Sequence, residues 1–256
     1  MPQVAAPRVT YDAAAQADKP AAYWTMSSPR SSTEKDRTGH GHTGRYFGRP
    51  AATRLPNGDT AADFDGKTAY LQVKDAAALS PATGGVLTLE AWMRPDALKF
   101  PVEGNNMRYM HWMGKGEPNN HEYVARFYSN TDPQRPNRIS GYQFNIDGGK
   151  GAGSYFQDTI RAGTWIHYVL VINAKAKSDS YPNGYVRIYR DGKLRDTTNL
   201  DYGGTVIVPK RGNAPFRIGT RDLDTFFEGA IGKVAIYGKE LRPESIKKHY
   251  TVMTRR

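Results

Sequence analysis

The sequence predicts an all-β protein in which two antiparallel sheets pack as a β-sandwich, with short helices near both ends. The composition of 16 tyrosines, 4 tryptophans and 26 glycines among 256 residues favours strands joined by tight turns. Asn-Gly and Asp-Gly pairs at 57–58, 183–184 and 191–192 flank short apolar runs, as β-hairpins require. Several of those runs alternate apolar and polar residues with the period of two that strands show.

The first expected element is a short helix over 12–17, which ends before Pro20. Strands are expected over 86–92 and 184–190, because side chains of two kinds alternate along both. In each of these strands we expect one buried face and one open face that is polar and aromatic. A closing strand near 231–237 and a helix that begins at Pro243 complete the chain, since proline is tolerated in the first turn of a helix.

A set of ordered motifs resembles the LamG-like domains of the laminin G and concanavalin A-like superfamily. The resemblance spans about 19–250 and implies a concanavalin A-like two-sheet antiparallel β-sandwich, the jelly roll. We therefore divide the chain into an N-terminal arm (1–18), the LamG-like sandwich (19–250) and a basic tail (251–256). The motifs lie at 19–24, 36–46, 62–66, 70–73, 87–95, 163–169, 186–194 and 229–250.

The charge balance indicates an anionic partner. A net charge of +11 favours acidic glycans, teichoic acids or nucleic acid by long-range attraction, although basic residues scattered along the chain also fit an ordinary soluble surface. No recognition helix or zinc-finger pattern supports nucleic acid. No apolar stretch approaches the roughly 20 residues that span a bilayer. We therefore expect a cell-surface or cell-wall glycan as partner, without nucleic acid and without membrane insertion.

The start of the chain predicts where the protein acts. The whole sequence contains no cysteine, and it opens without the basic and apolar regions of a signal peptide. We therefore expect the protein to be synthesised in the cytoplasm, which for a phage protein is that of the host. Residues 9–14 and 18–24 resemble virion proteins of actinobacterial phages, which implies a tail or capsid-surface location beside other virion subunits. A secreted lectin-like domain is the alternative. A homo-oligomer is compatible with both, since avidity strengthens weak glycan contacts.

The candidate glycan-binding residues come from three expected consecutive strands over 107–115, 121–128 and 137–145. Alternation puts Arg126 and Tyr128 on one face, and Gln143 with Asn145 on one face of the next strand. Aromatic rings stack on sugars, while guanidinium and amide groups bind hydroxyls or carboxylates. The alternative is that the aromatic residues fill the core and that Arg126 pairs with Glu122 or Glu90. The candidate set is His111, Trp112, Arg126, Tyr128, Gln143 and Asn145.

The sequence argues against catalysis. Glycoside hydrolases of the resembled superfamily carry Glu-x-Asp-x-Glu on one strand, whereas Glu90 has no carboxylate two residues later and retaining hydrolysis needs two, about 5 Å apart. Asp222, Asp224 and Glu228 are interpreted as solvated turn residues. An anionic-polysaccharide lyase remains a third hypothesis, although Asn145 stands where alginate lyases carry histidine. We expect a non-catalytic module.

No cofactor is expected. LamG-like domains often bind calcium through acidic residues of the closing strand, but Gly232 and Lys233 stand at those positions and disfavour a hard cation. Asp65, in a Phe-Asp-Gly turn, is the remaining metal candidate. The alternative for Asp65 is a turn carboxylate that accepts hydrogen bonds from backbone amides.

Overall fold

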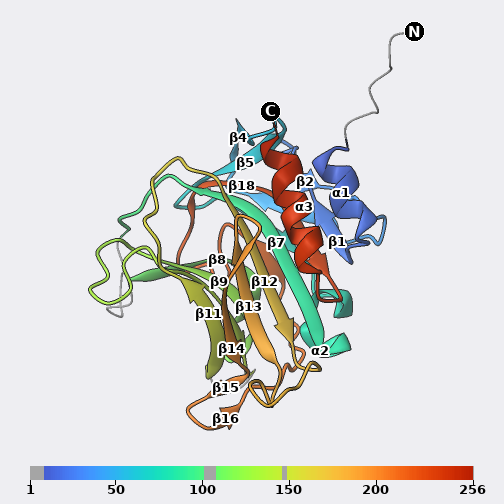
Figure 1. The fold of residues 1–256 in the computed structure, drawn as a ribbon. Coiled ribbons are helices and arrows are strands. Elements are labelled where there is room, and N and C mark those ends of the chain that lie inside the picture. Colours follow the sequence, from blue (N-terminus) through green and yellow to red (C-terminus); the bar gives the residue numbers. More distant parts are fainter. Residues whose placement is uncertain (1–8, 101–107, 146–148, 256) are drawn as a thin grey trace.

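The computed structural model describes residues 9–100, 108–145 and 149–255. In these residues two antiparallel sheets pack face to face, which confirms the predicted sandwich (Figure 1). A separate ribbon pairs β15 (Asp201–Tyr202) with β16 (Thr205–Val206). Residues 1–8 of the predicted arm and Arg256 of the predicted tail lie outside the described residues.

Sheet A has eight strands within the described residues. These strands are β1 (Ala22–Trp24), β4 (Ala51–Arg54), β5 (Thr60–Asp65), β7 (Val86–Pro95), β12 (Ile166–Asn173), β13 (Tyr185–Arg190), β14 (Lys193–Asn199) and β18 (Glu228–Tyr237). Their spatial order is β14-β13-β12-β7-β18-β5-β4, and β1 pairs with β18.

Sheet B likewise has eight strands in the described part of the chain. These are β2 (Thr33–Glu34), β3 (Gly44–Phe47), β6 (Tyr70–Val73), β8 (Tyr109–Glu117), β9 (Asn120–Tyr128), β10 (Ile139–Phe144), β11 (Gly151–Phe156) and β17 (Phe216–Ile218). The spatial order is β11-β10-β9-β8-β17-β6-β3-β2, so β8, β9 and β10 are neighbours, as the candidate site requires.

The helices are α1 (Tyr11–Ala17), the 3-10 turn η1 (Ala77–Leu79), α2 (Pro81–Gly84) and α3 (Pro243–Thr254). The predicted helix over 12–17 is therefore found, and the Thr10 hydroxyl caps it by accepting the N–H of Ala13 at 3.2 Å. The C-terminal helix begins at Pro243 as predicted. It continues to Thr254 and buries Met253, so most of the predicted tail over 251–256 is helical.

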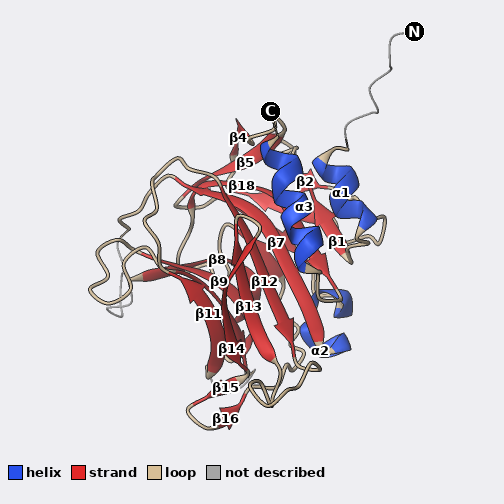
Figure 2. Ribbon diagram, viewed as in Figure 1, coloured by secondary structure: helices blue, strands red, loops and turns tan. Residues whose placement is uncertain are grey.

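The main core lies between the two sheets. Leu87 and Leu89 of β7, together with Val186 and Ile188 of β13, point into it as their alternation predicts. The expectation of an open opposite face on β7 is wrong: Glu90 has no exposed surface and Trp92 is 1 % exposed. Both faces of β7 are buried because the terminal helices cover sheet A from outside (Figure 2).

A second apolar cluster joins these helices to sheet A. Tyr11 and Ala15 of α1 pack in it with Ile246 and Met253 of α3, against residues such as Val169 of β12. The boundary drawn at residue 18 therefore separates α1 from the sheet on which it packs. In the described residues no helix covers the outer face of sheet B (Figure 2), and no helix is both long and apolar enough to cross a membrane.

Candidate functional site

Two of the six predicted contacts face the core. Trp112 is fully buried, with its ring centroid 5.0 Å from that of Tyr168 on the facing sheet. Gln143 is also fully buried, and its amide donates to the carbonyl of Phe144 at 2.8 Å. Ile139 and Gly141 share this inward face of β10, where alternation places Gln143 as well. The prediction that Trp112 and Gln143 contact a glycan is therefore wrong.

Asn145 lies apart from the other predicted contacts. Its side-chain oxygen accepts the N–H of Val208 at 3.2 Å. Ser140 pairs with Arg126 across the β9–β10 ladder, so Asn145, the residue after the end of β10, is about 17 Å farther along the chain direction. The structure does not bring Asn145 to the others.

The remaining predicted residues meet on the outer face of sheet B. Arg126 is at the centre, with its guanidinium carbon 3.9 Å from the ring centroid of Tyr109 and 4.5 Å from that of Tyr142. Its Nε donates to His111 Nε2 at 3.0 Å, and one Nη donates to the Tyr128 hydroxyl at 3.2 Å. The sequence did not single out Tyr109 and Tyr142. We call the following residues the arginine–tyrosine cluster: Tyr109, His111, Arg126, Tyr128, Arg135 and Tyr142.

His111 holds Arg126 in place as a neutral acceptor. Burial lowers the pKa of His111 to about 3, so the ring is uncharged at neutral pH. Its Nδ1–H donates to Asp222 at 2.9 Å, which leaves Nε2 to accept from Arg126. Burial alone would raise the pKa of Asp222, but the bond from His111 and the charge of Arg221 outweigh it and hold that pKa below its ordinary value. Asp222 is 8 % exposed rather than a solvated turn residue.

Tyr128 positions the arginines. Only 2 % of its surface is exposed, and its hydroxyl accepts from Arg126 at 3.2 Å and from Arg135 at 3.0 Å. Burial would raise the pKa of Tyr128, but the two guanidinium groups outweigh burial and lower it. Tyr128 is therefore too buried for the predicted stacking of its ring on a sugar, whereas Tyr109 and Tyr142 beside it are partly exposed.

A groove of about 670 Å³ adjoins the cluster, at the β9–β10 loop. Arg108, Arg126 and Arg135 line it and form no ion pair within the described residues, so the groove is positively charged. Asp132 also lines it, but one of its carboxylate oxygens accepts the N–H groups of Gln134 and Arg135. The wall thus combines guanidinium groups with tyrosine rings.

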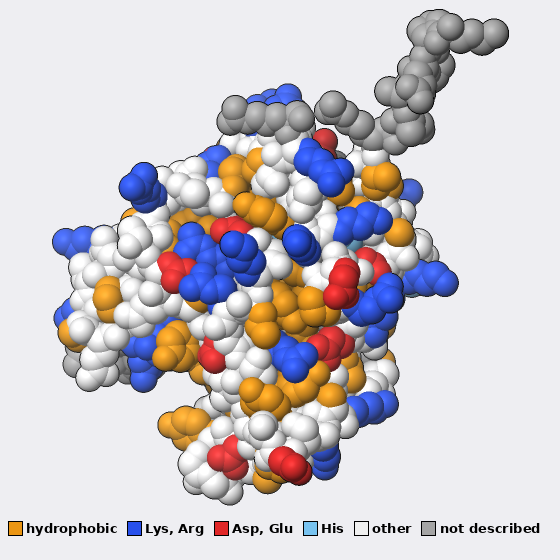
Figure 3. Space-filling view, in the orientation of Figure 1, with side chains coloured by type: hydrophobic (Ala, Val, Ile, Leu, Met, Phe, Trp, Pro, Cys, Tyr) orange, Lys and Arg blue, Asp and Glu red, His pale blue; other side chains and the backbone are white. Residues whose placement is uncertain are grey.

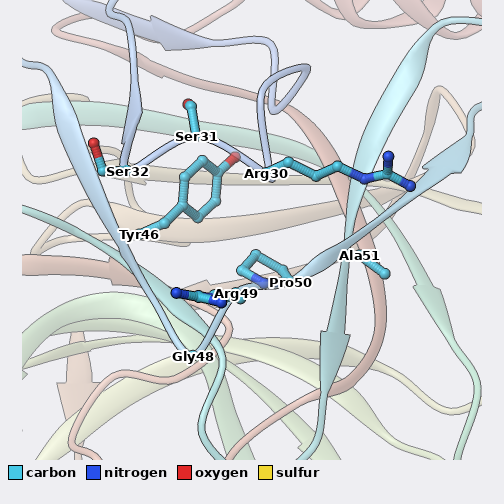
Figure 4. Close-up of a pocket in the computed structure, with 8 residues that line it drawn as sticks. All are labelled: Arg30, Ser31, Ser32, Tyr46, Gly48, Arg49, Pro50 and Ala51. Atoms are coloured by element: carbon cyan, nitrogen blue, oxygen red, sulfur yellow. The ribbon is translucent and has the colours of Figure 1, made fainter.

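A second hollow of about 610 Å³ lies at the other edge of sheet B. Arg30 and Arg49 line it but extend in different directions, as Figure 4 shows. The Tyr46 hydroxyl donates to Glu34 at 2.9 Å. This hollow therefore lacks the convergence of side chains seen around Arg126.

The metal candidates are occupied by protein groups. Asp65 accepts backbone N–H bonds from Lys67, Thr68 and Ala69 and a hydroxyl bond from Thr68, all at 2.8–2.9 Å. Burial would raise its pKa, but these bonds lower it to about 2, so Asp65 has the contacts of a turn carboxylate, which was the alternative to a metal ligand. No group of three or more potential metal-binding side chains occurs in the residues that the structure describes. The Lys233 ammonium lies 2.5 Å from the carboxylate of Asp12 and 2.7 Å from that of Asp59, so it balances the charge of these two acids.

Glu90 is remote from the cluster and closed to solvent. The Tyr11 and Tyr237 hydroxyls donate to it at 3.0 and 2.9 Å. His167 and His249 contact it at 2.7 and 3.0 Å. A carboxylate buried beneath two helices cannot reach a sugar.

Known proteins share both the sequence pattern and the fold of this chain. A model of the concanavalin A-like lectin/glucanases superfamily, Laminin_G_3, matches residues 65–247. No curated protein matches the chain. Among solved structures, domain 4 of an extracellular GH43 arabinanase from Geobacillus stearothermophilus, in complex with arabinotriose, is 17 % identical with a TM-score of 0.63. The match covers 91 % of this chain and 98 % of that domain.

Receptor-binding regions of botulinum neurotoxins have the same fold. The binding domain of botulinum neurotoxin DC, in complex with rat synaptotagmin II, is 14 % identical with a TM-score of 0.66, over 92 % of this chain and 52 % of that one. A structure of type C, whose cell entry depends on interaction with two ganglioside molecules, is 14 % identical with a TM-score of 0.65, over 91 % and 50 %. The chain thus spans about half of the toxin chains it matches. On the family match and the observed jelly roll, this chain belongs to the concanavalin A-like lectin/glucanase superfamily.

Proposed function

We propose that this protein is a non-catalytic carbohydrate-binding module and that the arginine–tyrosine cluster is its binding site. The observation that carries the proposal is Arg126, held between Tyr109 and Tyr142 on the outer face of sheet B beside a groove. Such rings stack on the apolar faces of sugars, and guanidinium N–H groups bind their oxygens. Lysine and arginine side chains spread over most of the face in Figure 3, so charge alone would not select a site.

The similar proteins support this proposal at the level of the fold. The arabinanase domain was solved with arabinotriose, and neurotoxin type C interacts with gangliosides. The jelly roll of this chain therefore belongs to an architecture on which glycan-binding surfaces occur.

The chemistry of the cluster supports a binding role without turnover. Both ring nitrogens of His111 are engaged, one by Asp222 and one by Arg126, so His111 is not free to accept a substrate proton. Gln143, which a lyase would present to a uronate, points into the core. Glu90 is buried on the opposite sheet.

The biological setting that we propose is the surface of a phage virion, as a tail or capsid component that contacts host-envelope glycans. The resemblance of 9–14 and 18–24 to virion proteins of actinobacterial phages supports this setting. Secretion as a bacterial lectin-like domain is the alternative. Mass spectrometry of purified virions tests the virion setting. We expect peptides of this chain in the amounts of a structural subunit, and their absence would contradict the virion assignment.

The binding function is tested by retention of the purified protein on isolated actinobacterial cell-wall polysaccharide. We expect retention of the parent protein and loss for Arg126→Ala, while Arg37→Gln, which removes one exposed charge beside β2, is retained. Ultraviolet absorbance in the same samples should not rise, because a rise would report the unsaturated products of a lyase. Equal retention of Arg126→Ala would exclude the cluster as the site.

A further inference from the structure

We propose that the arginine–tyrosine cluster selects acidic glycans, by binding the carboxylate of a uronic acid or another carboxylated sugar to Arg126 and Arg135. This inference rests on the proposed carbohydrate-binding function of the same site. It adds the chemical class of the ligand and names the two guanidinium groups that recognise it.

The first argument is the supply of unused donors. A guanidinium has five N–H groups. Arg126 uses two of them, one on His111 and one on Tyr128, so three remain for a ligand. The side chain of Arg135 donates one bond to Tyr128 and is otherwise exposed. Both arginines therefore keep donors at the groove, and Tyr128 connects them.

The second argument is the charge of the groove. Its lining includes three arginines and one aspartate, Asp132, whose carboxylate is bound by the turn that follows it. Asp222, the other acid near the cluster, is 8 % exposed and bonded to His111 and Arg221. A neutral sugar would leave this positive charge unbalanced, whereas a carboxylated sugar would neutralise part of it.

The third argument is the fixed plane of Arg126. Tyr109 and Tyr142 lie on the guanidinium at 3.9 and 4.5 Å, and the bond from Nε to His111 fixes its rotation. A planar fork held in this way binds a carboxylate through two parallel hydrogen bonds and loses little entropy on binding. A lysine at position 126 would keep the positive charge but could not make the two parallel hydrogen bonds.

Isothermal titration with matched polymers tests the inference. The probes are polygalacturonate, alginate and hyaluronan, each compared with its carboxyl-reduced form, which keeps the sugar rings and removes the charge. At physiological salt we expect at least one acidic polymer to bind about tenfold more tightly than its reduced form, as loss of one charged bidentate contact implies. Dextran sulfate distinguishes recognition of carboxylate from attraction of any anion, and it should bind more weakly.

The variants Arg126→Lys and Arg135→Lys keep the net charge and should each weaken the acidic polymer about tenfold. Arg37→Gln, which lowers the net charge by one away from the cluster, should change affinity less than twofold. Thermal unfolding verifies that each variant is folded. Arg135 is exposed, so its variant remains informative if Arg126→Lys does not fold.

The outcomes separate the two proposals. Equal affinity for acidic and reduced polymers, with loss in the Arg126→Lys protein, overturns acidic selectivity and leaves the carbohydrate-binding function intact. If Arg37→Gln lowers the affinity for the acidic polymer as much as Arg126→Lys does, acidic selectivity at the cluster is also overturned. The polymer would then be attracted by the net charge of the protein rather than by Arg126. Failure to bind these polymers, their reduced forms and cell-wall polysaccharide contradicts both proposals.

Discussion

Arg126 was predictable as a candidate, but its surroundings were not. Alternation along one strand indicates that Arg126 and Tyr128 share a face. The rings of Tyr109 and Tyr142 come from neighbouring strands, and contact across strands depends on register. A bulge between His111 and Met113 shifts that register, and no single-strand pattern reveals it. Gln143 shows the converse limit, since alternation defines two faces without saying which is buried.

The ring of Tyr142 should contribute more to binding than its hydroxyl does. Replacement by leucine removes one of the two rings on Arg126, so we expect affinity for the bound glycan to fall about fivefold, the size of a cation–π contact near 1 kcal/mol. Tyr142→Phe keeps the ring and removes only the hydroxyl, which interacts with Tyr128, so it should lower the affinity less than Tyr142→Leu in the same titration. A fall in Tyr142→Phe as large as in Tyr142→Leu would show that the hydroxyl, not the ring, is required.

His111 should make stability depend on acid. Burial lowers the pKa of His111 to about 3, against about 6.5 in an unfolded chain, so between these values only the unfolded state takes up the proton. Its contribution is complete above pH 6.5 and is lost as pH falls toward 3. Urea unfolding of the parent and His111→Gln at several pH values should show their difference in unfolding free energy shrinking, by at most about 1.4 kcal/mol per pH unit. A constant difference would mean that folding does not lower the pKa of His111.

At the scale of elements, α1 and α3 decide which sheet is available. Both helices were predictable from the sequence, by the run before Pro20 and by Pro243. Their position on sheet A was not, because period-two alternation in β7 indicates two faces and says nothing of what covers them. Glu90 and Lys233 fix that position through bonds to Tyr11 and Asp12 of α1. Lys233, predicted only as unfavourable for calcium, is therefore part of the attachment of α1.

Glu90 should govern the pH range over which these helices stay attached. Burial would raise the pKa of Glu90, but His249 and His167 outweigh it and lower that pKa. The contribution of Glu90 is therefore complete above about pH 4.5 and is lost as pH falls. Burial would lower the pKa of His249, yet Glu90 and Asp18 raise it, so its contribution is present below about pH 6.5 and is lost as pH rises.

We therefore expect the Glu90 cluster to stabilise the protein most between about pH 4.5 and 6.5. Glu90→Gln should lower unfolding free energy by about 3 kcal/mol there, the cost of breaking a buried ion pair. The measurement is the unfolding temperature of parent and variant across pH. Parallel profiles for the two proteins would contradict the assigned role of Glu90.

At the scale of the whole molecule, the ordered motifs were sufficient to predict the jelly roll. The boundary at residue 18 was drawn where the resemblance begins. The structure shows that α1, which precedes this boundary, packs against α3 and sheet A. The resemblance identifies the sandwich but carries no information on segments that pack upon it. The cluster likewise could be predicted only in part, because loop and strand register bring Arg135, Tyr109 and Tyr142 to Arg126.

Deletion of 1–18 should destabilise the sandwich as a whole. Tyr11, Ala14 and Ala15 would leave buried positions, and Glu90 would lose one hydrogen bond. A loss of about 3–5 kcal/mol corresponds to a fall of roughly 10 °C in the unfolding temperature of a chain of this size. Calorimetry of the truncated and full chains checks this, with Tyr11→Phe as the milder comparison. An unchanged unfolding temperature would support the interpretation of 1–18 as an arm.

The terminal helices on sheet A, and the outer face of sheet B that no described helix covers, give the molecule two different faces (Figure 1). Any surface that holds the protein by α1 and α3 would present Arg126 outward, whereas coupling through sheet B would conceal it. Orientation alone would then switch a layer of these molecules between adhesive and inert. On a sensor chip, immobilisation through the two ends of the described chain should preserve glycan capture, and random lysine coupling should give a mixed population.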